Sequence, residues 1–159
     1  MFSGPANSET YGTSGDWIIN VNDHGSCVLS RYVGDQFYAI GAEWDQTAQQ
    51  FYWTVLFYSP ELGGLPPGGQ YPVDLKVKDA PWQMGSTAEI ISSQDVSYVR
   101  VEIHDYDFGT AFREGSVFTV GAARKDYHLP LDGSAAAQDV YVGCFLNSFV
   151  QPTAQNPFE

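Results

Sequence analysis

Four side chains capable of acid–base or metal chemistry lie close together in the sequence. Glu102 and His104 are two residues apart in a segment with strand-like alternation, so their side chains fall on the same face. Asp105 and Asp107 follow at the spacing that opens an EF-hand calcium loop, but the glycine and glutamate needed at loop positions 6 and 12 are missing. Two interpretations remain open. The four residues form the metal site of a small hydrolase or metal-dependent enzyme, or they form a solvated surface with carboxylates that cap a helix.

Other catalytic motifs are present only as fragments. The Asp-Phe-Gly of Asp107–Gly109 lacks the glycine-rich loop, the strand lysine and the catalytic-loop aspartate of a kinase. Asp132–Ser134 has the Asp-Gly-Ser order of an aspartic protease, but it occurs once, and that chemistry needs two carboxylates. The sequence therefore favours a non-catalytic protein, and we expect no cofactor.

Aromatic side chains suggest a binding surface. The segments Gln36–Trp44 and Phe51–Tyr58 read as neighbouring antiparallel strands joined by the polar loop 45–50. Rings on one face of this pair would form a platform for an unknown protein or a glycan, while the alternative is that they fill the core. Trp44 is the strongest candidate, because it ends its strand beside the polar loop. The full set of candidates is Tyr38, Trp44, Tyr52 and Tyr58.

The stretch 59–70 (SPELGGLPPGGQ) reads as a long loop, since its three prolines and four glycines exclude a helix or a central strand. Loops of this length are often functional. A third hypothesis is therefore an inhibitor or virulence-linked adaptor that uses this loop as its contact.

The remaining chain reads as short strands separated by turns, with a few helical residues. The segment 51–58 is apolar on both faces, as a central strand would be, whereas 71–78 alternates like a half-buried antiparallel strand. The strands are expected at 16–21, 26–32, 36–44, 51–58, 71–78, 87–91, 97–104, 116–122 and 127–131.

Two short helices complete the prediction. The first is expected at about 105–114 and the second at about 134–147, with Ser134 as the N-cap of the second. The predicted fold is mainly β: an antiparallel β-sandwich or open barrel with these two helices. With 159 residues, the chain fits one β-rich domain at 15–149, a flexible N-terminal segment at 1–14 and a flexible tail at 150–159.

The charge of the chain limits its partners. A net charge of −12 argues against a nucleic acid and against anionic lipid, both of which attract basic residues. No segment approaches the roughly 20 apolar residues of a membrane span, so we expect no membrane insertion, and the oligomeric state stays open. The polar, Gly/Ser-rich start reads as that of a periplasmic or secreted protein whose signal peptide is absent from this chain.

The two cysteines, Cys27 and Cys144, lie on an early predicted strand and on the last predicted helix. A bond between them would tie the helix to the sheet and, across a loop of this length, stabilise the fold by about 4–5 kcal/mol at most. The even count and the export-like start favour a disulfide, and the alternative is two buried thiols.

Several of these features together resemble small secreted or periplasmic proteins of alphaproteobacteria and, more distantly, proteins of the invasion-associated locus B type. They are Trp17, Gly25 with Cys27, the stretch 65–77 (LPPGGQYPVDLKV) before Trp82, the stretch 129–137 (LPLDGSAAA) before Cys144, and Asn156–Phe158. This resemblance implies export and a disulfide bond. It implies no reaction.

Overall fold

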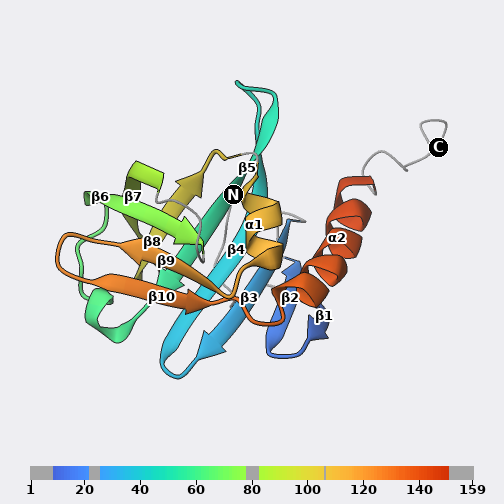
Figure 1. Ribbon diagram of the computed structural model, residues 1–159, viewed down its shortest axis with the longest axis horizontal. Helices are drawn as coiled ribbons and strands as arrows, with labels where there is room; N and C mark the ends of the chain where they lie inside the picture. Colours follow the sequence, from blue (N-terminus) through green and yellow to red (C-terminus); the bar gives the residue numbers. More distant parts are fainter. Residues whose placement is uncertain (1–8, 22–25, 78–82, 106, 151–159) are drawn as a thin grey trace.

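The computed structural model describes residues 9–21, 26–77, 83–105 and 107–150, with the backbone alone at 148–150. Its strands are antiparallel and belong to one ten-stranded sheet (Figure 1). They are β1 (Glu9–Ser14), β2 (Trp17–Val21), β3 (Cys27–Val33), β4 (Gln36–Asp45), β5 (Gln50–Tyr58), β6 (Gln70–Val77), β7 (Gln83–Ser93), β8 (Val96–Ile103), β9 (Val117–Gly121) and β10 (Asp126–Pro130).

The strand order is β1-β2-β3-β4-β5-β8-β7-β6-β9-β10. The first five strands form a meander. β5 is a central strand, as predicted from a sequence that is apolar on both faces. Figure 1 shows β9 and β10 crossing in front of β3 and β4, so the sheet curls over on itself. The edge strands β1 and β10 do not pair with each other, and the fold is therefore an open antiparallel barrel.

The core fills the inside of this curl. Alternating side chains from most strands point inward, including the fully buried Ile40 and Val55 of the central pair. The ring of Phe57 on the central strand β5 lies 5.4 Å from that of Tyr127 on the edge strand β10, so strands that are far apart in the sheet order share one core.

Two helices cover the open end and one flank of the sheet. α1 (Phe108–Glu114) buries Phe108 and Phe112. Gly115 ends α1, and a β-carbon there would lie 2.6 Å from the Val77 side chain and 2.8 Å from the Ala111 carbonyl oxygen. Only glycine allows this close approach of backbone to neighbour.

α2 (Ser134–Val150) packs against β1, β2 and β3. The predicted Cys27–Cys144 disulfide is confirmed, with the two Cα atoms 6.1 Å apart. It joins the start of β3 to the middle of α2. No helix within the described ranges is long and apolar enough to span a membrane.

The structure differs from the sequence predictions in several places: α1 begins at Phe108, β7 spans Gln83–Ser93, and α2 extends to Val150. Residues 9–14, expected to be flexible, form the edge strand β1 paired with β2. The hydroxyl of Ser134 donates to the Phe112 carbonyl oxygen at 2.8 Å, which is not the N-cap bond expected of it. Residues 1–8, Gly25, Trp82 and the tail from 151 onward lie outside the described residues.

The loop 59–70 is attached to the barrel at several points. Its Leu62 and Leu65 side chains pack on the core, and the Leu65 carbonyl oxygen accepts a bond from the Ser97 hydroxyl at 2.7 Å. Gly68 donates its N–H to the Ile90 carbonyl oxygen. A short 3₁₀ helix, η2 (Pro60–Leu62), lies within the loop. The loop is thus a packed part of the fold.

Candidate functional site

The β4–β5 hairpin extends beyond its neighbours. β3 pairs with β4 only as far as Ile40, and β8 pairs with β5 only as far as Trp53. The two strands nevertheless continue to the pair Asp45–Gln50. Beyond the pair Ala42 and Trp53 the hairpin is therefore a two-stranded ribbon, and Figure 1 shows its tip protruding from the molecule.

The buried tyrosine Tyr141 of α2 holds the base of this ribbon. Its hydroxyl accepts the N–H of Ala42 at 2.8 Å, at a position where β4 has no partner residue on β3. Tyr141 is 3% exposed, and burial raises its pKa to about 12. A side chain thus satisfies a backbone donor that would otherwise lack a partner.

The inner face of the ribbon carries exposed aromatic rings. Trp44 and Phe51 are directly opposite each other, with ring centroids 4.8 Å apart in an edge-to-face arrangement. Phe51 in turn contacts Phe145 of α2 at 5.3 Å. Trp44 and Phe51 are each 44% exposed, because the core-facing row of the hairpin continues past the end of the core.

α2 adds aliphatic surface next to Phe145. Val142 and Leu146 are one helical turn apart and 46% and 53% exposed, whereas Ala137 and Cys144 on the opposite face are buried. Val142 and Leu146 thus add an apolar strip to the C-terminal half of α2, on the side away from its buried face. We define the hairpin patch as Trp44, Phe51, Val142, Phe145 and Leu146.

The outer face of the ribbon is polar. Glu43 accepts hydrogen bonds from the Tyr52 hydroxyl at 2.9 Å and from the Thr54 hydroxyl at 3.0 Å. The Tyr52 ring stacks on the His104 ring, with centroids 4.8 Å apart. Desolvation, together with the hydrogen bond to Glu43, raises the pKa of Tyr52 to about 12. Arg100 lies 3.7 Å from Glu43. These contacts brace the hairpin against β8.

The four residues proposed for metal chemistry separate into two groups. Glu102 and His104 form an exposed pair on the outer face, with Nε2 of His104 3.2 Å from Oε2 of Glu102. Asp105 instead accepts bonds from the Gln83 side chain and from the N–H of Asp107. In the part of the chain that the structure describes, no three His, Cys, Asp or Glu side chains are grouped to hold a metal ion.

The four aromatic candidates do not form one platform. Tyr38 is fully buried and belongs to the core, so a surface role for it does not fit the structure. Tyr52 and Tyr58 lie on the outer face of the sheet, where Tyr58 contacts Tyr98 at 5.9 Å. Trp44 alone of the four has its ring exposed on the inner side.

Phe51 and Phe145 complete the hairpin patch and were missed in the sequence. The sequence did indicate a role for Phe51: it is the first apolar residue after the turn, and a hairpin therefore puts it opposite Trp44. Phe145 had no such signal, since its position depends on how α2 docks on the sheet.

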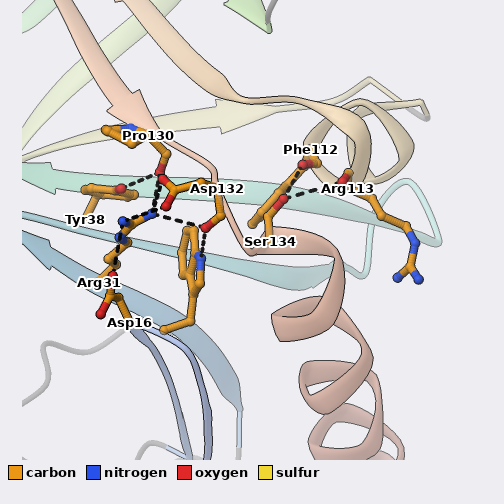
Figure 2. A network of polar contacts seen from close by, with 9 residues as sticks. Asp16, Arg31, Tyr38, Phe112, Arg113, Pro130, Asp132 and Ser134 are labelled. Carbon is orange, nitrogen blue, oxygen red and sulfur yellow. Dashed lines mark hydrogen bonds and ion pairs between the residues drawn. The ribbon is translucent and has the colours of Figure 1, made fainter.

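A second polar network, shown in Figure 2, closes the open side of the barrel. The buried Arg31 of β3 donates to both carboxylate oxygens of Asp132, at 2.7 and 3.2 Å. Trp17 donates its ring N–H to the Asp132 carbonyl oxygen at 2.9 Å, and the Tyr38 hydroxyl donates to the Pro130 carbonyl oxygen. The hydrogen bond from Arg31 holds the pKa of Asp132 below its usual range. These side chains join the end of β10 to β2, β3 and β4 without any strand pairing.

The chain is thus an open, ten-stranded antiparallel barrel whose last helix is joined to the sheet by a disulfide. No protein-family model and no curated protein matches its sequence. Among solved structures it is similar to the crystal structure of invasion associated protein B from Bartonella henselae, with 19% identity and a TM-score of 0.51, over 86% of this chain and 96% of that chain. The resemblance inferred from the sequence is thereby confirmed at the level of the fold.

Proposed function

We propose that this protein is an exported, non-catalytic binding protein that holds a protein partner through the hairpin patch. The observation that carries the proposal is the exposed pair Trp44 and Phe51, each 44% exposed on a protruding hairpin. Large rings held in fixed positions bind with little loss of side-chain entropy. Tryptophan is also among the residues most often found as binding hot spots.

The construction of the hairpin supports this role. The two inner rings contact each other, and Phe51 contacts Phe145, while Tyr52 and Thr54 both donate hydrogen bonds to Glu43 on the outer side. The patch is therefore held in position before any partner arrives. A pre-organised surface of this kind increases affinity by lowering the cost of ordering on binding.

Charge indicates the kind of partner. The chain carries a net charge of −12, and Asp45 lies at the tip of the hairpin beside the patch. Repulsion between two such chains disfavours self-association, whereas a partner with lysines or arginines around an apolar face is attracted. We infer a basic protein segment with apolar side chains as the ligand.

Export is supported by the disulfide, because such bonds persist mainly in oxidising compartments. The name of the structural neighbour, invasion associated protein B, is that of a protein linked to invasion. We propose that the chain works in the periplasm or outside the cell, because its disulfide would persist there. The loop 59–70 is packed on the core through Leu62 and Leu65 and hydrogen-bonded to Ser97, so we favour the hairpin over this loop as the contact surface.

A peptide library displayed on phage tests the proposal. The oxidised wild-type protein is the bait, after the library has been cleared on the Trp44→Ala variant. We expect the retained peptides to combine aromatic or aliphatic residues with lysine or arginine. Peptides that show no such enrichment, or a selection that retains none above background, would contradict the proposed partner class.

A further inference from the structure

The last helix, α2, is attached to the rest of the protein by different contacts in its two halves. In the first half, the side chains of Ser134 and Gln138 donate hydrogen bonds to carbonyl oxygens of α1, at 2.8 and 3.2 Å. Asp139 forms an ion pair with Arg113 of α1 at 2.7 Å. This half is therefore held by polar contacts to the neighbouring helix.

The second half of α2 is attached to the sheet around the disulfide. Cys144 is bonded to Cys27 at the start of β3, and the two residues are 0% and 3% exposed. Tyr141, three residues before Cys144, accepts a backbone N–H of β4 at the base of the ribbon. Phe145, directly after Cys144, contacts the ribbon at 5.3 Å. The disulfide thus lies between the two side chains of α2 that contact the hairpin.

We propose that this disulfide is a redox switch for the hairpin patch. The chain is folded in both states, but the patch is assembled only when the bond is present. Two bonded sulfur atoms are closer than unbonded ones can approach, so reduction in a closely packed site moves Cys144 away from β3. Tyr141 and Phe145 move with it, because they lie on the same helix. This inference rests on the binding function proposed above.

Formation of the bond is a two-electron oxidation. The thiols of Cys27 and Cys144 pass two electrons and two protons to the disulfide of an oxidant, which is released as a dithiol. The cytosol keeps thiols reduced, whereas oxidising compartments supply such a disulfide. The chain therefore acquires its binding surface after export, and an excess of a dithiol reverses the step.

Amide hydrogen exchange tests the switch without any partner, on oxidised protein and on protein reduced with dithiothreitol. We expect the Ala42 amide to exchange at least about tenfold faster after reduction, because its acceptor on Tyr141 is displaced. The Val55 amide in the middle of the sheet should keep its exchange rate. So should the Ala137 amide, which is bonded to the Gly133 carbonyl oxygen in the first turn of α2.

Two variants separate the disulfide from the other contacts of α2. The double variant Cys27→Ser and Cys144→Ser should show the fast Ala42 exchange with or without dithiothreitol, which removes any dependence on access of the reductant to the buried bond. Asp139→Asn weakens the ion pair with Arg113 in the first half of the helix and should leave Ala42 exchange unchanged. Re-oxidation of the reduced wild type with oxidised glutathione should restore the slow exchange.

Binding supplies a second measurement. A peptide selected on the oxidised wild type should bind at least about tenfold more weakly to the reduced protein. Unchanged Ala42 exchange in both the reduced protein and the double variant would overturn the switch. Equal acceleration of the Ala42, Val55 and Ala137 amides would also overturn it, because the bond would then stabilise the whole fold. If no peptide is selected, the proposed function fails, while the exchange experiment still decides whether the disulfide controls the hairpin.

Discussion

Two tryptophans of this chain occupy opposite environments. Trp17 is 1% exposed, donates its ring N–H to Asp132 and lies under the guanidinium of Arg31. Trp44 is 44% exposed, with its ring against Phe51. The same residue type thus serves the core at one position and a surface at the other.

Substitution of each tryptophan by alanine should separate these roles. Trp17→Ala should lower the free energy of unfolding by about 3–5 kcal/mol, as expected for a large ring removed from a core. Trp44→Ala should lower it much less, because the half-exposed ring leaves no enclosed cavity when it is removed. Denaturant unfolding measures both. If the two variants lose similar stability, Trp44 is part of the core and the hairpin patch is not a binding surface.

The Arg31–Asp132 pair should make stability depend on pH in the acid range. The pKa of Asp132 in the folded protein is lowered, so its contribution is fully present above the unfolded value of about 3.9. That contribution is lost as the pH falls through the folded pKa. Asp132→Asn should therefore be less stable than the wild type at neutral pH, and the difference should shrink below about pH 4. Chemical denaturation at several pH values gives both curves. A difference that does not change with pH would show that the ion pair does not cause it.

At the scale of elements, the hairpin depends on α2. Tyr141 supplies the acceptor for the Ala42 N–H, where β4 has no neighbour on β3. Tyr141→Phe removes that acceptor with little change of shape and should cost about 1–3 kcal/mol. In the Tyr141→Phe variant, we also expect the Ala42 amide to exchange its hydrogen faster than the Ile40 amide, because Ile40 keeps its partner on β3. Equal protection of Ala42 in variant and wild type would mean that the hydroxyl does not hold the hairpin.

The disulfide joins α2 to the sheet, and its loss should loosen the helix. A double Cys27→Ser and Cys144→Ser variant should lose about 2–5 kcal/mol, since a loop that spans 117 residues is no longer closed in the unfolded chain. Thermal unfolding measures this loss when the variant is compared with the oxidised wild type and with the reduced wild type. Reduced protein as stable as oxidised protein would argue that packing alone holds α2.

The strands were predictable where one face is buried. Tyr71–Lys78 and Ser97–His104 alternate clearly, and β6 and β8 follow them within a few residues. β1 was not predicted, since its residues are mostly exposed and are ordered by the pairing with β2 and by contacts with α2. Tyr38 and Trp44 are on the same face of β4, but Tyr38 lies inside the core and Trp44 lies beyond its end. The sequence could not distinguish these two positions. That difference depends on where β3 and β8 end, which is a tertiary property.

At the scale of the whole molecule, the protein is an acidic barrel with the apolar hairpin patch on its surface. The seam formed by Arg31, Asp132 and Trp17 closes the body, the disulfide holds α2 against it, and the hairpin patch extends outward. The net charge of −12 adds long-range attraction for a basic partner. Salt should therefore weaken binding to the patch mainly by slowing association, because screening shortens the range of that attraction.

The affinity of a peptide selected on the wild-type protein tests the proposed function most directly. Its dissociation constant would be measured for the wild type, for Trp44→Ala and for Met84→Ala, a control whose side chain is 73% exposed on β7 outside the patch. We predict binding at least about 30-fold weaker for Trp44→Ala, equivalent to a hot spot of about 2 kcal/mol, and no change for Met84→Ala. Equal affinity of the wild type and a folded Trp44→Ala variant would contradict the account.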